Sequence, residues 1–489
     1  MHFKKRWIAW ALLALWIVVG GWHVYKPMPA GTDLSTPAQT IPASDVRFLY
    51  DLTYMSPQGK PLHEQEIFDA IFAVVAAAES FIVADFFLFN DLMGADNAAH
   101  RPLSRELADQ LLAKKRTRPA MTILLVTDPI NDVYGGITSP LLDELRAAGI
   151  DVVMTNLPRL RDSNPLYSPW WRMLVQHWGN KPDKGSLPNP FDTGPSRITL
   201  RSWLALANFK ANHRKLIVAD RADGTLTALV TSANPHDASS AHSNVAIEFT
   251  GEAARSLLES ELAIARFSGW QGHLDAAARE AADVAQPDGT VELTYLTEGS
   301  IREHLLQAIA ATRRGDAIRI ATFYLSDRAI IEALLDAATE RGVDVRLILD
   351  PNRDAFGRSK DGVPNRPVAN ELVTASGGKV QVRWYRTHGE QFHTKLALIT
   401  HGERLIVSLG SANLTRRNLD NYNLEANVGL AMSTNEPLAR QMLGYFDRLW
   451  NNEGPAGTEY TAPFGAYEDA SRAKYWRYRL MEATGLSTF

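Results

Sequence analysis

The sequence predicts an α/β protein made of two duplicated domains, each a sheet flanked by helices, behind one N-terminal transmembrane helix. Three observations predict this architecture. Short apolar runs alternate with amphipathic helical stretches, a pattern typical of α/β domains with largely parallel sheets. The same order of motifs occurs twice along 489 residues, a length too great for one ordinary core. An uncharged apolar segment precedes both copies.

The apolar segment at residues 7–25 contains no Asp, Glu, Lys or Arg and is close to the length needed to cross a bilayer. Lys4, Lys5 and Arg6 precede it, whereas Lys26 alone follows closely. Because positive charge favours the cytoplasmic side, we expect a single-pass membrane protein with both domains on the extracytoplasmic side. The alternative is a signal peptide that is cleaved.

Composition narrows the possible functions. The chain has no cysteine, which excludes disulfides, thiolate chemistry and a cysteine-based zinc site. A net charge of −4 argues against a general nucleic-acid binder, although a local basic cleft is compatible with it. An apolar content of 45% is that of a globular protein.

Internal comparison shows a duplication that covers most of the chain. The matching segments, first copy then second, are 81–88 with 318–325, 121–129 with 344–351, 231–234 with 410–413, and 243–247 with 426–430. Helices are expected before the first pair, at about 63–79 and 300–313.

The two copies divide the chain into consecutive parts. We expect an anchor at 1–26, a linker at 27–45, a first domain at 46–270 with an insertion at about 156–205, a connector at 271–288, a second domain at 289–450 and a tail at 451–489.

The most informative repeated motif is a histidine and a lysine two residues apart, His213 with Lys215 and His393 with Lys395. On a strand, residues two apart share one face. An apolar run follows each pair and ends at Asp220 in the first copy, but at Thr400 in the second. A serine and an asparagine then follow in both copies: Ser232 and Asn234, Ser411 and Asn413.

These residue types support phosphoryl transfer. One histidine can attack phosphorus, and a second can protonate the leaving alkoxide and later activate the acceptor. Two lysines and two Ser/Asn pairs can bind the phosphate oxygens and offset charge in the transition state. No cluster of typical cation ligands accompanies the motif, so the expected chemistry needs neither a metal nor another cofactor.

The paired motifs resemble the HxKx4D and GSxN signatures of the phospholipase D superfamily, and the resemblance covers residues 46–450. Within the superfamily, the anchored chain looks most similar to bacterial cardiolipin synthase-type phosphatidyltransferases. The resemblance implies two phospholipase D-like domains with mixed sheets in a pseudo-twofold arrangement. It also implies phosphodiester exchange through a phosphohistidine, with His213 as nucleophile and His393 as general acid and base. An alcohol acceptor gives transfer, and water gives hydrolysis.

Several positions depart from the family pattern. Thr400 replaces the second aspartate, and Thr231 replaces the first glycine of GSxN. The family places an acidic residue downstream that orients the histidine of the opposite half, and Glu425 fits this place for His213. In the first half the aligned residue is His242, and Glu248 is expected to substitute. The alternative is that both glutamates are ordinary charges at strand edges.

Other residues have two interpretations. Asp220 is expected to anchor the turn after its strand. Polar residues after the Asp-Pro strand ends could bind acceptor hydroxyls or simply cap turns: Asp128, Asn131, Asp132, Asp350, Asn352 and Asp354. The insertion contains the Trp-rich stretch 165–179, which could be an interfacial element, the wall of a lipid pocket, or a satellite core. The basic, aromatic C-terminal tail could pack on the body or lie on anionic lipid.

The sequence therefore predicts an enzyme that moves or hydrolyses phosphatidyl groups. Its expected partners are a phospholipid substrate and the membrane, without nucleic acid. One alternative is a nuclease of the same superfamily. The other is a lipid-binding scaffold that has lost catalysis, an interpretation motivated by Thr400 and His242.

Overall fold

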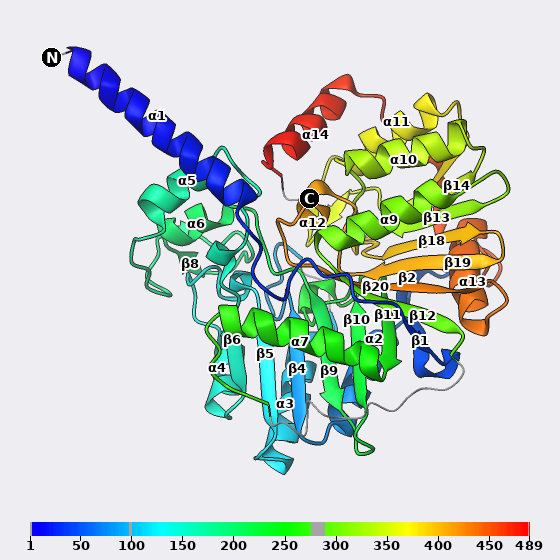
Figure 1. Cartoon of the computed structure of the whole chain (residues 1–489), viewed down its shortest axis with the longest axis horizontal. Helices are drawn as coiled ribbons and strands as arrows, with labels where there is room; N and C mark the ends of the chain where they lie inside the picture. The colour runs from blue at the N-terminus through cyan, green and yellow to red at the C-terminus, as the bar shows by residue number, and fades with distance from the viewer. Residues whose placement is uncertain (1, 97–99, 275–288, 488) are drawn as a thin grey trace.

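The computed structural model describes residues 2–96, 100–274, 289–487 and 489, and it contains two large sheets that pack against each other (Figure 1). The first sheet has the strand order β3-β2-β11-β10-β9-β4-β5-β6, and the second has the order β1-β12-β20-β19-β18-β13-β14-β17-β21. Seven consecutive positions, from β2 to β6 and from β12 to β17, have the same order in both sheets. The duplication seen in the sequence is therefore also a duplication of topology.

The strands of the first sheet are β2 (Val46–Met55), β3 (Pro61–Glu64), β4 (Phe81–Phe86), β5 (Thr122–Thr127), β6 (Asp151–Met154), β9 (Lys215–Asp220), β10 (Leu226–Thr231) and β11 (Asn244–Thr250). Those of the second are β1 (Gln39–Ile41), β12 (Val291–Thr297), β13 (Ala317–Thr322), β14 (Asp344–Leu349), β17 (Val380–Tyr385), β18 (Lys395–His401), β19 (Arg404–Gly410), β20 (Ala426–Ser433) and β21 (Thr461–Pro463). Two small ribbons are formed by β7 (Leu187–Pro188) with β8 (Arg197–Ile198) and by β15 (Asp354–Ala355) with β16 (Arg358–Ser359).

Both sheets are mixed, so the expectation of largely parallel sheets is wrong, whereas the mixed sheets implied by the family resemblance are confirmed. Only β4, β5 and β6, and their counterparts β13, β14 and β17, pair in parallel. The strands from β9 to β11 and from β18 to β20 pair antiparallel. Part of the physical reason is that the connections from β9 to β10 and from β18 to β19 are short, because a tight turn can join only antiparallel neighbours.

Helices cover both sheets. The outer face of the first sheet carries α2 (Ile67–Ala77), α3 (Leu103–Thr117) and α4 (Pro140–Ala147), and that of the second carries α9 (Gly299–Ala311), α10 (Arg328–Thr339), α11 (Asn365–Ala375) and α12 (Arg416–Leu419). Helices α7 (Glu252–Phe267) and α13 (Pro437–Asn451) pack against the core between the sheets. The helices expected at about 63–79 and 300–313 are α2 and α9. In α2 the buried side chains recur every three or four residues, as one face of a helix requires.

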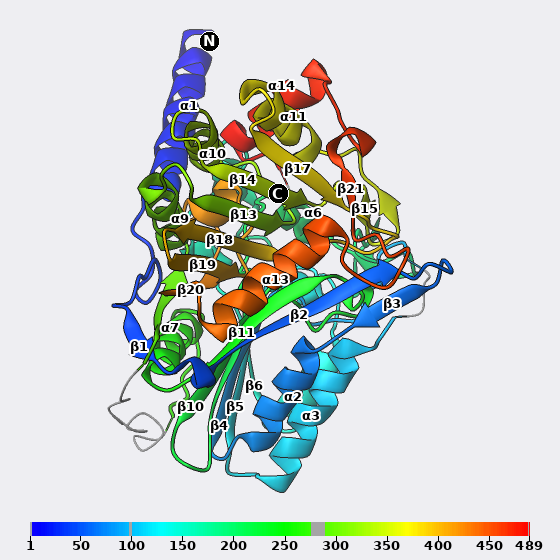
Figure 2. The ribbon, with the colours of Figure 1, turned by 90° about the vertical axis from the view of Figure 1, so that its right-hand side faces the viewer.

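A hydrophobic core lies between the two sheets and joins the halves. It contains Leu216 and Val245 of the first half with Leu396 and Val428 of the second, together with residues of α7 and α13. Figure 2 shows α13 beside β2 and β11, where Tyr445 packs against the first half. Each sheet buries its other face under its own helices in a separate core. The histidine strands β9 and β18 are therefore buried on both faces, which fixes their register.

A buried arginine network also joins the halves. Arg214, between His213 and Lys215, is fully buried and donates to Glu261 of α7 at 2.7 Å and to Glu298 of the second half at 2.7 Å. Glu298 additionally accepts the backbone N–H of Glu425 at 2.9 Å. Alternation along the strand sends Arg214 to the face opposite its neighbours. The network therefore links the first histidine motif to the segment around Glu425.

The N-terminal helix α1 (His2–Tyr25) is long and apolar enough to cross a bilayer, and its side chains are mostly exposed. Residues 27–45, predicted as a linker, are bound to the second half over part of their length. Within them β1 pairs with β12, and the Leu34 N–H donates to Thr297 at 2.7 Å. Of the predicted connector 271–288, residues 275–288 lie outside the described residues.

The insertion contains α5 (Ser168–Trp170), a π-helix (Trp171–Val175) and α6 (Leu200–Leu206). The satellite-core interpretation holds for one of its tryptophans and not for two others. Trp171 is buried in a small separate core with Val175 and Ala205, whereas Trp170 and Trp178 are exposed. The C-terminal helix α14 (Arg472–Thr484) packs on the second half, where Tyr478 is buried and donates to Glu371 at 2.6 Å.

The arginine network gives a stability prediction. Arg214→Met should lower the free energy of unfolding by about 3–5 kcal/mol, because it leaves buried carboxylates without their cation. The exposed pair of Arg47 and Glu248 is a matched control, and Arg47→Met should cost less than about 1 kcal/mol. Denaturant unfolding of the detergent-solubilised chain measures both changes. If Arg214→Met and Arg47→Met lowered the free energy of unfolding by equally small amounts, the arginine network would not join the halves as we infer.

Candidate active site

Two short backbone bridges bring the histidine motifs together. Asn212 pairs with Leu424 and Ser243 pairs with Phe392, each joining a segment of one half to a segment of the other. His213 donates its N–H to Leu424 O at 2.8 Å, and Ser243 donates its N–H to Gln391 O at 3.1 Å. Each histidine therefore lies two residues before its strand, directly after the residue that bridges to the opposite half.

His213 faces a carboxylate that comes from the other half. Its Nδ1 lies 3.0 Å from Oε2 and 2.9 Å from Oε1 of Glu425. Glu425 is fully buried and also accepts hydrogen bonds from Ser411 Oγ at 2.5 Å and from Asn418 Nδ2. Because Nδ1 faces a carboxylate, it carries the proton, and Nε2 is left as the basic nitrogen. The placement is the one expected for Glu425.

His393 faces an amide in the corresponding place. Its Nδ1 lies 3.1 Å from Oδ1 of Asn244, and the same oxygen accepts from Ser232 Oγ at 2.9 Å. The Asn244 Nδ2 donates to His242 O at 3.0 Å, which fixes the orientation of the amide. Asn244 is thus the first-half counterpart of Glu425, and sequence reasoning missed it.

The predicted alignment around Asn244 was wrong by two residues. In the ladders, Thr231 pairs with Ala246 and Gly410 pairs with Asn427, so Ala246, rather than Asn244, corresponds to Asn427. The loop from Ser411 to Glu425 is two residues longer than the loop from Ser232 to Asn244. Repeated Asn-Val pairs in the two strands produced the false match, and only the ladder register reveals it.

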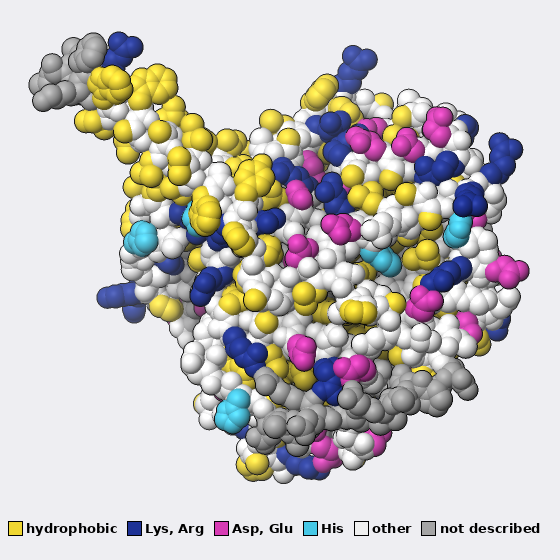
Figure 3. All heavy atoms as spheres, in the orientation of Figure 1, with side chains coloured by type: hydrophobic (Ala, Val, Ile, Leu, Met, Phe, Trp, Pro, Cys, Tyr) yellow, Lys and Arg dark blue, Asp and Glu magenta, His cyan; other side chains and the backbone are white. Residues whose placement is uncertain are grey.

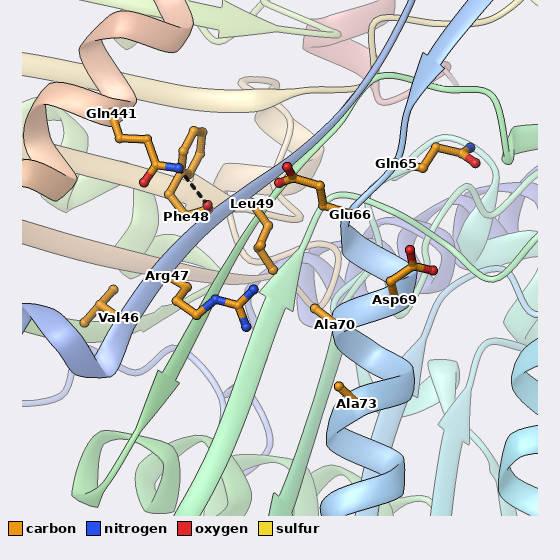
Figure 4. Close-up of a pocket in the computed structure, with 10 residues that line it drawn as sticks. All are labelled: Val46, Arg47, Phe48, Leu49, Gln65, Glu66, Asp69, Ala70, Ala73 and Gln441. Carbon is orange, nitrogen blue, oxygen red and sulfur yellow. Dashed lines mark hydrogen bonds between the residues drawn. The ribbon is translucent and has the colours of Figure 1, made fainter.

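The expectation that Glu248 substitutes as the partner of His393 is also wrong. Its carboxylate is 2.8 Å from Nη1 of Arg47, its partner on the neighbouring strand β2. Arg47 lines a surface pocket of about 650 Å³ between β2, α2 and Gln441 (Figure 4). No residue of either histidine motif lines this pocket. The alternative interpretation, an ordinary charge at a strand edge, is right for Glu248 in that the group only forms a surface ion pair, although its strand β11 is not an edge strand. It does not hold for Glu425.

The two lysines occupy equivalent buried positions. Lys215 Nζ donates to His213 O at 2.6 Å, and Lys395 Nζ donates to His393 O at 2.8 Å. A phenylalanine packs on each pair: the ring of Phe87 lies 4.9 Å from that of His213, and the ring of Phe323 lies 5.1 Å from that of His393. The aromatic rings exclude water from both pairs and strengthen electrostatic interactions there.

Burial weakens the basicity of all four groups. It lowers the pKa of His213 to about 4, with Glu425 opposing the effect and Lys215 adding to it. It lowers the pKa of Lys215 to about 7. The pKa values of His393 and Lys395 lie well below their ordinary values because of burial and the nearby lysine charges. Such a site favours an anionic ligand, since a negative charge restores the cationic forms.

The Ser and Asn residues of the motif differ in what they contact. The hydroxyls of Ser232 and Ser411 bond to Asn244 and Glu425, the groups that face the histidines. Asn234 Oδ1 accepts the N–H of Leu88 at 3.1 Å. Asn413 Oδ1 is buried and has no hydrogen-bond partner among the described residues.

The aspartates of the two Asp-Pro strand ends support the backbone ahead of each histidine. Asp128 accepts the N–H of Asn212 at 2.7 Å, and Asp350 accepts the N–H of Phe392 at 2.7 Å. Each also accepts an N–H of its own turn. Burial raises the pKa of both carboxyls to about 7. Their oxygens are thus engaged with the backbone, as the turn-residue interpretation expects.

Asp220 is structural, as expected. Its carboxylate accepts the N–H groups of Ser80 and Phe81 at 3.0 Å each and so anchors the start of β4. It ends β9, about 16 Å along the strand from Lys215. In the second half Thr400 accepts the N–H of Ala317 at 2.9 Å, and Asp316 accepts the neighbouring N–H of Gly402. The Thr400 substitution therefore removes no group from the site.

A third histidine borders the site. The ring of His242 lies 5.9 Å from that of His393 and stacks on Phe356 at 5.7 Å. Its Nδ1 accepts the N–H of Gln391, so Nε2 carries the proton. That Nε2 is buried without a hydrogen-bond partner among the described residues. Burial holds the pKa of His242 well below its ordinary value, so the ring is a neutral N–H donor.

Comparison with known proteins matches the second half at the level of sequence. Residues 305–450 match the family model described as the cardiolipin synthase, phospholipase D-like domain. No curated protein matches the chain by sequence.

Comparison with solved structures matches the whole chain at the level of fold. A phosphatidylserine synthase from Haemophilus influenzae Rd KW20 is similar with a TM-score of 0.56 and 12% identity, over 92% of this chain and 95% of that chain. Two other structures are less similar. A polyphosphate kinase from Porphyromonas gingivalis has a TM-score of 0.45 and 13% identity, over 94% of this chain and 56% of that chain. Nuc, a phospholipase D family member from Salmonella typhimurium, has a TM-score of 0.25 and 23% identity, over 33% of this chain and 95% of that chain.

The first of these similarities extends over nearly the full length of both chains, and at 12% identity it is a likeness of fold. The cardiolipin synthase-type match adds sequence evidence for the second domain. The resemblance to the phospholipase D superfamily that the paired motifs indicated is thereby confirmed by sequence for residues 305–450, and the rest of the chain is similar in fold.

Proposed function

We propose that the protein is a phosphatidyltransferase or phosphodiesterase that acts on phospholipids through a phosphohistidine on His213. The match to a cardiolipin synthase-type domain supports phospholipid phosphodiester chemistry in general. The observation that carries the finer proposal is that each histidine is oriented by the opposite half, His213 by Glu425 and His393 by Asn244.

In the first step, Nε2 of His213 attacks phosphorus and the bond from phosphorus to the leaving oxygen breaks. The imidazolium of His393 gives its proton to that oxygen. In the second step, an acceptor hydroxyl or water passes a proton to His393 and attacks phosphorus, and the P–N bond breaks. Lys215 and Lys395 offset the negative charge of the phosphoryl oxygens throughout.

The difference between the orienting groups supports this division of roles. The Glu425 carboxylate stabilises positive charge on His213 as its P–N bond forms. The Asn244 amide orients His393 but adds no negative charge, so protonated His393 is the stronger acid. The anionic diester itself raises the pKa of His393 enough for it to hold a proton at the start.

The remaining motif residues take supporting roles in this proposal. Ser232 and Ser411 hold the groups that orient the histidines, rather than binding phosphate directly. Asn413, whose buried oxygen has no hydrogen-bond partner in the described part of the chain, and Asn234 border the phosphate. His242 offers a neutral N–H beside His393 and suits an oxygen of the leaving or accepting group.

Trapping the intermediate tests the function. With a phosphatidyl ester of p-nitrophenol the leaving group needs no proton, so His393→Asn should accumulate an acid-labile, alkali-stable lipid adduct on full-length protein in vesicles. His213→Ala should form none. An adduct that survives in His213→Ala and disappears in His393→Asn would reverse the assignment. If the wild-type protein forms no adduct and turns over no phospholipid, the alternative of a lipid-binding scaffold without catalysis is favoured.

The orienting carboxylate gives a second prediction. Glu425→Gln should lower kcat on the order of 10²–10⁴-fold, since an amide cannot accept from Ser411, Asn418 and His213 together and misorients the imidazole. Glu248→Gln is the matched control and should stay within roughly twofold, because that group pairs only with an exposed arginine. Steady-state rates measure both. The reverse order would mean that the wrong carboxylate supports the histidine.

The amide beside His393 gives a prediction about pH. In Asn244→Asp a carboxylate would lie about 3 Å from Nδ1 and favour the imidazolium, which raises the pKa of His393. The general acid works in its protonated form, so the alkaline limb of the kcat/KM profile should move to higher pH. Exposed Asn435→Asp should leave the profile unchanged. An alkaline limb that does not move in Asn244→Asp would show that His393 is not the acid.

A further inference from the structure

The Trp-rich insertion has an unusual outer face. Leu166, Trp170, Leu174 and Trp178 follow one another at intervals of four residues, and their exposed fractions are 46%, 46%, 56% and 48%. Trp170 lies in α5 and Leu174 in the π-helix, and Leu166 and Trp178 lie just before and after these helices. Residues four apart in such helices lie on about the same side. The inner side carries the buried Trp171 and Val175. We call these four exposed residues the apolar stripe.

The stripe is continuous with the N-terminal helix. The rings of Trp16 and Trp170 lie 6.5 Å apart, and a Cβ at Gly20 would lie 3.0 Å from Pro169. Further along the helix, Asp162 donates its N–H to His23 O at 2.9 Å. Figure 3 shows the apolar side chains of α1 continuing onto the body at the base of the helix. One face of α1 therefore packs along the insertion.

This packing sets the depth of the stripe. With a rise of 1.5 Å per residue, the contact covers about the last 14 Å of α1, from Trp16 to Tyr25. A hydrocarbon core is about 30 Å thick, so a helix that spans it would place Trp170 within the outer half of the bilayer. A protein surface that contacts lipid acyl chains at that depth must be apolar, and the four residues of the stripe are apolar.

Exposed cations flank the stripe on both sides in the sequence. Arg159 precedes the insertion helix, and Lys181 and Lys184 follow the stripe; all three are exposed. Apolar side chains at the acyl boundary with cations at the phosphate level are the pattern of an interfacial membrane element. A helix that faces water would instead carry polar and charged side chains on its outer face.

The segment is also rigidly tied to the first histidine strand. Asp162 accepts from Arg172 at 2.6 Å and from Lys210 at 2.6 Å, and all three side chains are largely buried. Lys210 lies three residues before His213 in the sequence. The position of the stripe relative to a lipid surface therefore sets the position of the candidate site as well.

We propose that the apolar stripe inserts into the outer leaflet beside α1 and seats the body of the protein on a phospholipid bilayer. An anchor without the contact between α1 and the insertion would leave the body free to tilt at the end of the helix. With the stripe inserted, the helix and the insertion form one membrane-embedded unit that fixes the height of the paired histidines above the lipid phosphates. The proposal concerns membrane seating and does not depend on which reaction the site performs.

The absence of cysteine allows a direct test by single-cysteine spin labelling of the full-length chain in vesicles that contain phosphatidylglycerol. Nitroxides at Leu174→Cys and Trp178→Cys should be relaxed more by lipid-soluble oxygen than by a water-soluble nickel chelate. Val18→Cys on α1 supplies the bilayer reference. Leu62→Cys on β3, also an exposed apolar position at 41%, supplies the aqueous control.

Two results would overturn the proposal. Oxygen and nickel accessibilities at 174 and 178 equal to those at 62 would place the stripe in water. Shielding of both positions from both reagents would mean that a protein surface, such as a second copy of the chain, covers it. Since the readout is accessibility, an inactive preparation does not affect the outcome, and failure of the proposed reaction stays separate from failure of this proposal.

Discussion

The structure depends on a reciprocal exchange between its two halves. Each histidine directly follows a residue whose backbone bridges to the opposite half, and each imidazole is oriented by a side chain that the opposite half supplies. Neither half alone contains both a histidine and its orienting group. The buried contact of Arg214 with Glu298, which in turn accepts the Glu425 N–H, couples the exchange to the packing of the sheets. A large shared core then becomes a requirement of the site, since small shifts between the halves would separate the pairs.

The two halves contribute equivalent backbone contacts to this exchange, but the side chains that orient the two histidines differ in charge. Ser232 with Asn244 and Ser411 with Glu425 have the same geometry, yet one partner is neutral and the other is charged. A duplicated scaffold has thereby acquired two histidines with different electrostatic surroundings. This asymmetry is what a double displacement requires, because one imidazole must bond to phosphorus while the other exchanges a proton.

The sequence was sufficient where a signal is repeated or periodic. The paired His-x-Lys motifs, the strand and helix order, and the partnership of Glu425 with His213 could all be predicted, because each follows from spacing within one copy or from the family pattern. The role of Asn244 could not be predicted, because the loops after Ser232 and Ser411 differ in length and shift the alignment of the two copies. Only the register of the strand pairing corrects that alignment. The direction of pairing was also wrong, because alternating elements predict parallel strands while short turns dictate antiparallel ones. In the insertion, adjacent Trp170 and Trp171 lie on opposite sides of a helix, so composition alone could not assign either to core or surface. The domain boundaries remain predictions.

In the proposed mechanism, two half-sites form one centre for an in-line displacement at phosphorus. A crystal structure with orthovanadate, whose trigonal-bipyramidal form resembles the transition state of phosphoryl transfer, would show whether they do. We expect a single vanadate bonded to Nε2 of His213, with Nε2 of His393 at the opposite apical oxygen and both lysines at equatorial oxygens. Vanadate bonded to His393, or bound only in the pocket beside Arg47, would contradict it.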